Sequence, residues 1–97
     1  ICNGISLYED FLPFCSTFLA FSNYMLPAIR MAALMKLNVL YIFTHDSIFV
    51  GEDGVTHQPI EQLANLRSII GLNVFRPCDS NELLAGYKLA LEKSGPV

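Results

Sequence analysis

The sequence contains no tryptophan, only six lysine and arginine residues, and no long uninterrupted run of apolar side chains. With a formal net charge of −3, so few basic residues form no patch that would neutralise the phosphates of a nucleic acid. Polar residues, among them Arg30, Lys36 and Asn38, interrupt the apolar stretches well before the roughly 18 residues that a membrane span needs. We therefore expect neither nucleic acid nor a membrane as a partner.

The three cysteines form no paired pattern. Cys2, Cys15 and Cys78 are widely spaced, and no CxxC motif indicates a zinc site or a redox pair. Separated thiols, odd in number, favour a reducing, cytoplasmic location. The 97 residues are 53% hydrophobic and 15% charged, which is typical of one small domain that folds around a core.

The two ends of the sequence resemble cut points. Ile1 is not a starting methionine, and the first residues lack the basic stretch of a signal peptide. At the other end, Pro96 and Val97 follow a predicted helix and begin what resembles the next strand. We therefore expect the chain to be part of a longer protein, truncated at both ends.

Periodicity predicts alternating helices and strands. Good helix formers at 24–37 predict a mostly buried helix, with Pro27 either near its start or at a bend. The continuous β-branched and aromatic run at 39–43 is typical of a strand buried on both faces of a parallel sheet. A helix at 59–70, a short strand at 74–75 and a helix at 81–93 follow. This alternation predicts the α/β class, with a parallel sheet flanked by helices.

The two later helices have predicted ends and predicted inward faces. Gly71 is expected to end the helix at 59–70, and Asp79 or Ser80 to cap the helix at 81–93. The spacing of apolar residues predicts which side chains face the core: Ile60, Leu63, Leu66 and Ile70 from the first of these helices, and Leu83, Leu84, Tyr87 and Leu91 from the second.

Polar and titratable side chains gather in the loop after the strand at 39–43, where ligands collect in open parallel sheets. This loop holds both histidines of the chain, and its two glycines let the backbone fold back so that distant residues converge. Three interpretations stay open: solvated turn residues, such as an Asx turn at Asp46 or a helix cap at Thr56; a metal site; or a catalytic or binding site. The metal site is the weakest, because the spacing of His45 and His57 matches no zinc or calcium motif.

The stretch at 44–59, THDSIFVGEDGVTHQP, resembles the signature THDSIGxGEDGPTHQP of the transketolase family. As in that family, a helix of the type VEQxASLR follows, here IEQLANLR, and the resemblance continues through VFRPCD to the end of the chain. The sequence departs from the signature at Phe49, where the family commonly has glycine, and at Val55, where it has proline.

Aromatic residues recur every three or four positions between 11 and 24, a spacing typical of a helix that packs in a core. The longer pattern GISLxxxFLPFCSTFLxFSxY, however, resembles the transketolase segment GISLHGGFxPYxSTFLxFxxY. This resemblance implies that Phe18, Phe21 and Tyr24 line the pocket for the aminopyrimidine ring of thiamine diphosphate, with Phe21 stacked on the ring. Tyr8, Glu9 and Asp10 replace the family's HGG and receive no role.

The resemblance implies the thiamine-diphosphate-binding fold, with residues 1–97 forming part of the pyrimidine-binding domain of a transketolase. The implied reaction transfers a two-carbon ketol unit from a ketose phosphate to an aldose phosphate in the pentose phosphate pathway. His57 is the implied catalytic residue, and it also binds the carbonyl oxygen of the donor sugar. Asp53 is implied to bind a sugar hydroxyl, and His45 the phosphate end of the sugar.

Other parts of such an enzyme are expected outside this chain. In the family, a glutamate that activates the cofactor lies upstream of the position of Ile1, and an arginine downstream of Val97 shares the sugar phosphate. The diphosphate and its Mg²⁺ or Ca²⁺ are held by a separate domain, and the pocket forms between the subunits of a homodimer. The resemblance therefore implies that this chain supplies no metal ligand and is inactive when isolated.

Three alternatives stay open. The related 1-deoxyxylulose-5-phosphate synthase shares a GEDGxTH core, although its usual STFxQRxxDQ does not match STFLAFSNYML here. A non-catalytic dimerisation domain would keep the fold and lack ketol transfer. A metal-dependent hydrolase would use His45, Asp46 and His57 and would contain a transition metal.

Overall fold

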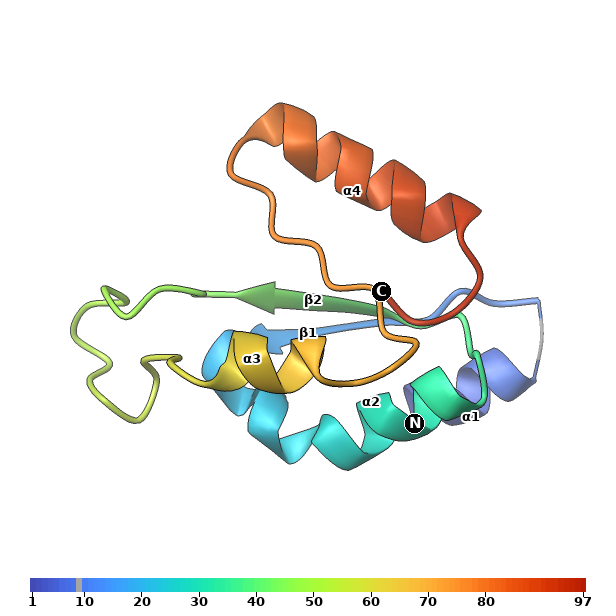
Figure 1. The fold of residues 1–97 in the computed structure, drawn as a ribbon, viewed down its shortest axis with the longest axis horizontal. Helices are drawn as coiled ribbons and strands as arrows, with labels where there is room; N and C mark the ends of the chain where they lie inside the picture. Colours follow the sequence, from blue (N-terminus) through green and yellow to red (C-terminus); the bar gives the residue numbers. More distant parts are fainter. Residues whose placement is uncertain (9) are drawn as a thin grey trace.

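A computed structural model describes residues 1–8 and 10–97, and Glu9, to which no role is assigned, lies outside the described residues. The elements in chain order are α1 (Cys2–Leu7), β1 (Phe14–Phe18), the 3₁₀ helix η1 (Leu19–Tyr24), α2 (Leu26–Leu34), β2 (Leu40–Thr44), α3 (Gln62–Arg67) and α4 (Ser80–Glu92). Figure 1 shows α4 on one side of the two strands and α1 and α2 on the other. The predicted α/β class, with a parallel sheet flanked by helices, is confirmed.

The two strands pair in parallel, with Phe14 opposite Leu40 and Phe18 opposite Thr44. The sequence predicts β2 to within one residue, because its continuous apolar run is characteristic of a buried strand. It does not predict β1, because the aromatic spacing of this stretch imitates a helix. The stretch is instead a strand followed directly by a 3₁₀ helix.

The short strand predicted at 74–75 is wrong, since these residues form no strand in the structure. The backbone just before them pairs with the end of the chain, where the Asn73 N–H donates to the Pro96 carbonyl at 3.0 Å. Val97 bonds to β2 on both sides of Leu40: its N–H donates to the Val39 carbonyl at 3.1 Å, and its carbonyl accepts from the Tyr41 N–H at 2.8 Å. These are the two hydrogen bonds that one residue makes in a parallel ladder, although Val97 itself is not assigned to a strand.

Helix α2 begins at Leu26 with Pro27 in its first turn, where a missing N–H costs no hydrogen bond. Its buried face carries Ile29, Ala32 and Ala33, and Ile29 packs with Leu19 and Leu66 in the core. The opposite face is exposed: Met31, Leu34 and Met35 lie there. The prediction of a helix buried on most sides is therefore wrong for this chain, because only one face has a neighbour among the described residues.

Helix α3 is about half as long as the prediction for 59–70. Leu66 is buried as predicted, whereas the predicted inward orientation of Ile60 and Ile70 is wrong: both lie outside the helix and are 79% and 93% exposed. Gly71 does not end the helix. With φ at 90°, it occupies a turn closed by the Leu72 N–H donating to the Ile69 carbonyl at 3.2 Å.

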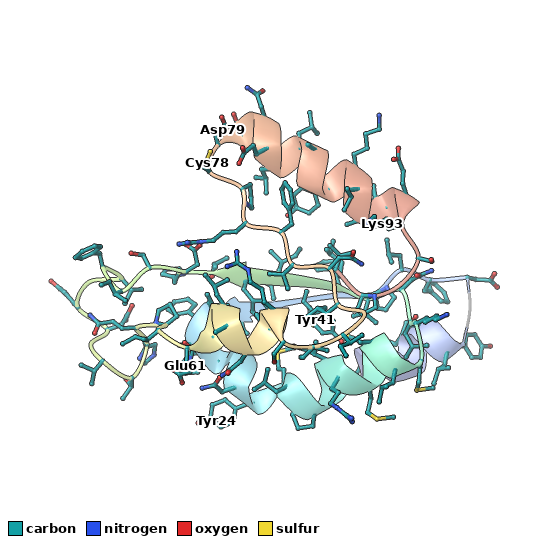
Figure 2. The ribbon with its side chains drawn as sticks, in the orientation of Figure 1. Tyr24, Tyr41, Glu61, Cys78, Asp79 and Lys93 are labelled. Carbon is teal, nitrogen blue, oxygen red and sulfur yellow. The ribbon has the colours of Figure 1, made fainter. Side chains whose placement is uncertain are left out.

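Helix α4 is capped by Asp79, one of the two predicted candidates (Figure 2). The Asp79 carboxylate accepts from the Glu82 N–H at 2.8 Å, and the Glu82 carboxylate accepts from the Cys78 N–H at 2.8 Å. The latter hydrogen bond lowers the pKa of Glu82, because it stabilises the charged carboxylate.

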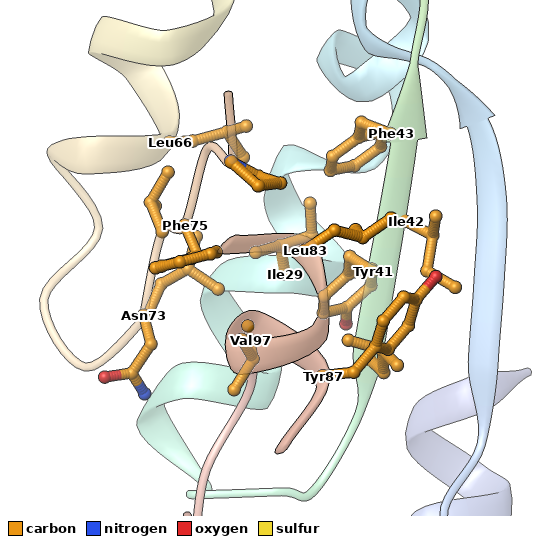
Figure 3. A pocket seen from close by; sticks show the side chains of 15 residues that line it. Ile29, Tyr41, Ile42, Phe43, Leu66, Asn73, Phe75, Leu83, Tyr87 and Val97 are labelled. Carbon is orange, nitrogen blue, oxygen red and sulfur yellow. The ribbon is translucent and has the colours of Figure 1, made fainter. Parts of the chain in front are cut away.

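Beneath α4 lies an apolar cavity of about 170 Å³, lined by side chains of β2, of α4 and of the segment at 72–77 (Figure 3). Leu83 and Tyr87 line this cavity, as their predicted inward orientation requires. Leu84 and Leu91 are exposed, so that part of the prediction is wrong. Gly86 is buried against the ring of Phe75. Among residues 1–8 and 10–97, no helix has both the length and the apolar character needed to cross a bilayer.

Cys15 and Tyr41 lie opposite each other in the sheet. The pKa of Cys15 is raised to about 11, mainly by burial and to a smaller extent by the neighbouring Cys2. The pKa of Tyr41 is raised to about 12, mainly by burial and to a smaller extent by the thiols of Cys15 and Cys2. A thiol with so high a pKa is a weak nucleophile at neutral pH, which agrees with a structural role for Cys15.

Candidate functional site

The carboxyl ends of β1 and β2 lie side by side. Phe18, the last residue of β1, is opposite Thr44, the last residue of β2. Because the strands are parallel, η1 and the loop after β2 leave the sheet from the same edge. The aromatic segment and the polar loop of the sequence therefore meet at this edge.

Five of the six candidate site residues form one cluster here, which we call the aromatic–histidine cluster: Phe18, Phe21, Tyr24, His45 and His57. The ring of His45 stacks on Phe18, with 3.7 Å between centroids and 15° between planes. The ring of His57 meets Phe21 edge to face at 5.0 Å and Phe18 at 5.9 Å. Phe21 also contacts Tyr24, with 6.3 Å between centroids. The structure thus brings both histidines against the aromatic wall.

Two glycine turns return the loop to the cluster. Gly51 and Gly54 have φ of 97° and 78°, which side chains with a Cβ rarely adopt. The Gly54 N–H donates to the Gly51 carbonyl at 3.4 Å, and the His57 N–H donates to the Gly54 carbonyl at 3.0 Å. These consecutive turns bring His57 back to the aromatic side chains, as the glycine content of the loop predicts.

His45 is held from both sides along the chain. Its backbone has φ of 53°, in the left-handed region, and its Nδ1 shares a 2.9 Å hydrogen bond with the Thr44 hydroxyl. The next residue, Asp46, is fixed by Arg76, whose Nε donates to the carboxylate at 2.6 Å and whose Nη2 donates to the Asp46 carbonyl at 3.3 Å. Asp46 is therefore an ion-pair partner and not an Asx-turn residue.

Other residues of the loop either form turns or contact the site residues. The Ser47 hydroxyl accepts from the Phe49 N–H at 3.1 Å in a local turn, as one interpretation of the sequence expects. Thr56 is not a helix cap, because its hydroxyl shares a 2.8 Å hydrogen bond with Nδ1 of His57. Phe49 is 87% exposed and does not have positive φ, so replacing glycine there imposes no left-handed strain.

Asp53, the sixth candidate, is exposed, and the ring contacts that define the cluster do not involve it. The structure gives it no hydrogen bond or ion pair with residues 1–8 or 10–97. Its carboxylate is therefore available to a ligand, and it forms no ion pair with either histidine.

A hollow of about 340 Å³ adjoins the cluster and combines aromatic with polar walls. Phe21 and Tyr24 form one wall, and Tyr24 is 86% exposed. Glu61, labelled in Figure 2, accepts from the Asn23 side chain at 3.3 Å, and the buried Gln62 donates to Glu61 at 3.1 Å. The hollow therefore combines apolar faces with hydrogen-bonding groups.

The geometry does not fit the metal-dependent hydrolase. Within the described part of the chain, no three His, Cys, Asp or Glu side chains lie close enough together to share a metal ion. Asp46 is engaged with Arg76, and the ring of His45 lies against Phe18. The proposed ligand set of that hydrolase is therefore not assembled.

Sequence reasoning missed three residues that shape this site, Thr44, Glu61 and Arg76, and it considered Thr56 only as a helix cap. The repeated Thr-His dipeptide was a usable signal for the two threonines, since each precedes a histidine. Nothing in the sequence pairs Arg76 with Asp46, because 30 positions separate them and only the fold brings them together.

Comparison with known proteins gives a consistent picture. The family model described as transketolase, pyrimidine binding domain, matches residues 1–97. A transketolase of Halalkalibacterium halodurans is 60% identical over 90 residues, which are 93% of this chain and 14% of that protein. A transketolase of Bacillus subtilis is 54% identical over 92 residues, 95% of this chain and 14% of that protein.

Solved structures agree in fold. A transketolase from Campylobacter jejuni superposes with a TM-score of 0.95 at 50% identity, covering 98% of this chain and 15% of that one. A transketolase from Pichia stipitis, in complex with sedoheptulose 7-phosphate, gives a TM-score of 0.93 at 43% identity, covering 98% of this chain and 14% of that one. The chain thus spans about one seventh of the length of these relatives.

Proposed function

The chain belongs to the transketolase family, through the pyrimidine-binding domain, and from this we propose that the complete protein transfers a two-carbon ketol unit between phosphorylated sugars. Residues 1–97 would form part of that domain. The observation that carries the proposal is the aromatic–histidine cluster at the joint carboxyl ends of β1 and β2. Such a cluster offers an apolar wall for a cofactor ring beside imidazoles that face a substrate.

The residues of the cluster suit thiamine diphosphate. When bound, this cofactor supplies the nucleophilic thiazolium carbon that takes up the ketol unit. Phe21 would stack on the aminopyrimidine ring, with Phe18 and Tyr24 closing the apolar wall around it. Glu61 and Gln62 lie in the adjoining hollow and can meet polar edges of the ring. These side chains orient the cofactor and exclude water from one of its faces.

The histidines and Asp53 would act on the sugar. His57 would donate from its ring to the carbonyl oxygen of the donor, where negative charge develops in the reaction. His45 would bind the phosphate end, and Asp53 would select a hydroxyl by accepting its proton in a hydrogen bond. An exposed carboxylate without a protein partner, as Asp53 is among the described residues, suits that role.

Several parts of the enzyme lie outside this chain in the proposal. The Mg²⁺ or Ca²⁺ and the cofactor diphosphate would be held by another domain, and the site would form between two subunits of a homodimer. The protein would work in the cytoplasm, in agreement with its three free thiols.

The test uses the complete protein with thiamine diphosphate and Mg²⁺, fructose 6-phosphate as donor and glyceraldehyde 3-phosphate as acceptor. Mass spectrometry should detect a five-carbon ketose phosphate and a four-carbon aldose phosphate. His57→Ala should lower the rate by about 100-fold or more, the cost of losing a donor to developing charge. Phe49→Gly, a change on an exposed side chain of the same loop, serves as the control.

No product from the unsubstituted protein would refute ketol transfer and favour a non-catalytic dimerisation domain. Unchanged turnover in His57→Ala, with the control also unchanged, would refute the assigned role of His57 alone.

A further inference from the structure

The two histidines of the cluster are held in the same way. Thr44 precedes His45 and Thr56 precedes His57, and each hydroxyl shares a hydrogen bond with Nδ1 of the following ring, at 2.9 Å and 2.8 Å. The two dipeptides lie at opposite ends of the loop, one at the end of β2 and one after the glycine turns. The same contact thus occurs in two different backbone settings.

The aromatic contacts alone do not orient the imidazoles. Stacking on Phe18 fixes the plane of the His45 ring, but a half-turn about χ2 keeps that plane and exchanges the ring edges. The edge-to-face contact with Phe21 leaves the same freedom to His57. A hydrogen bond between the threonine hydroxyl and Nδ1 removes this rotational freedom, because the edge of the ring that carries Nδ1 must then face the hydroxyl. Nε2 becomes the free ring nitrogen of each histidine.

We propose that Thr44 and Thr56 are positioning residues, which present Nε2 of His45 and His57 to the substrate. The inference rests on the proposed function. A hydroxyl suits this task because it both donates and accepts, so it pairs with Nδ1 in either neutral tautomer and in the imidazolium. A carboxylate or carbonyl oxygen would hold the proton on Nδ1. With a hydroxyl, Nε2 remains able to donate or to accept.

The experiment compares Thr56→Val, which keeps the shape of the side chain and removes the hydroxyl, with Thr56→Ser, which keeps the hydroxyl. In the complete protein, Thr56→Val should lower kcat/KM about 2- to 10-fold, the range expected for one partly exposed hydrogen bond. Most of the loss should fall in kcat. Thr56→Ser should recover most of the activity, and Thr17→Val, in β1, should match the unsubstituted enzyme.

Thr44→Val should instead raise KM for the phosphorylated donor with little change in kcat, because His45 is assigned to the phosphate end. Equal losses in Thr56→Ser and Thr56→Val would overturn the proposal, since the hydroxyl would then not be the active feature. Full activity in both valine variants would overturn it as well.

Crystal structures of the valine variants give a readout independent of activity. Rings that turn over, or occupy two orientations, support the proposal, and rings that keep a single orientation overturn it. This readout applies even if the unsubstituted protein lacks ketol transfer, a result that would refute the proposed function and leave the positioning role to be decided by the rings.

Discussion

Replacing Arg76 by alanine should weaken sugar binding from a position outside the aromatic–histidine cluster. Arg76 holds Asp46 through its carboxylate at 2.6 Å and its carbonyl at 3.3 Å, next to His45. Because the two side chains are 49% and 44% exposed, the ion pair contributes about 0.2–1 kcal/mol. The second hydrogen bond adds about 0.5–1.5 kcal/mol.

This contribution is comparable to the cost of the His45 backbone conformation. A residue other than glycine at a φ of 53° carries roughly 1 kcal/mol of strain or more, which neighbouring contacts must offset. Removing Arg76 should therefore shift the loop by about 1 kcal/mol away from the observed conformation, roughly a fivefold change in the equilibrium constant between the loop conformations. The apparent affinity falls in proportion to the competent fraction that is lost, so KM for the phosphorylated donor should rise, by at most about fivefold.

The assay measures initial rates of the complete protein over a range of fructose 6-phosphate concentrations. Arg67→Ala removes the same charge at the end of α3 and controls for nonspecific electrostatic effects. In Arg76→Ala, kcat should change little, because His57 is held by a different turn. A KM in Arg76→Ala equal to that of Arg67→Ala would refute the idea that this ion pair positions His45.

Three further changes test other parts of the structure. Phe21→Ala should weaken thiamine diphosphate binding, measured by calorimetry, more than it lowers the melting temperature; equal affinity in a folded variant would return Phe21 to a core role. Gly86→Ala should lower the melting temperature, because the new Cβ would lie 2.5 Å from the ring of Phe75, and an overpacking cost of about 1–3 kcal/mol exceeds a helix gain of about 0.5–1 kcal/mol. Adding Phe75→Leu should recover part of the loss. Because the pKa of Glu82 is lowered in the folded state, its stabilisation of α4 is present above its usual pKa of 4.5 and is lost as the pH falls below that value. Hydrogen exchange at the Cys78 amide should then lose protection, and Glu82→Gln should abolish this pH dependence.

Secondary structure is predicted best from the sequence where residues close together in the chain determine it. The strand β2 and the capped start of α4 are of this kind: a continuous apolar run has few alternatives to a buried strand, and Asp79 caps through the residue three positions later. The strand β1 fails this condition. Its aromatic residues are spaced as on a helix, and its conformation is set by the ladder with β2, a contact 26 positions away at Phe14 and Leu40.

The site divides in the same way. The aromatic residues and the histidines could be picked out from the sequence, because each lies at a fixed place in one of the two segments that resemble family motifs. The contact between Arg76 and Asp46 depends on the path of the chain through α3 and cannot be deduced from spacing. The sequence also does not predict that Ile60 and Ile70 are exposed. An apolar residue type does not reveal which neighbour, within this chain or outside it, would cover the side chain.

The pairing of Phe18 with Thr44 has a consequence for how this site tolerates change. The aromatic wall and the histidines belong to separate segments, and the ladder between β1 and β2 is what aligns them. Inserting or deleting one residue in β1 would displace Phe18 by about 3.3 Å relative to His45 and turn its side chain to the opposite face of the sheet. Length in β1 is therefore a stricter requirement than side-chain identity.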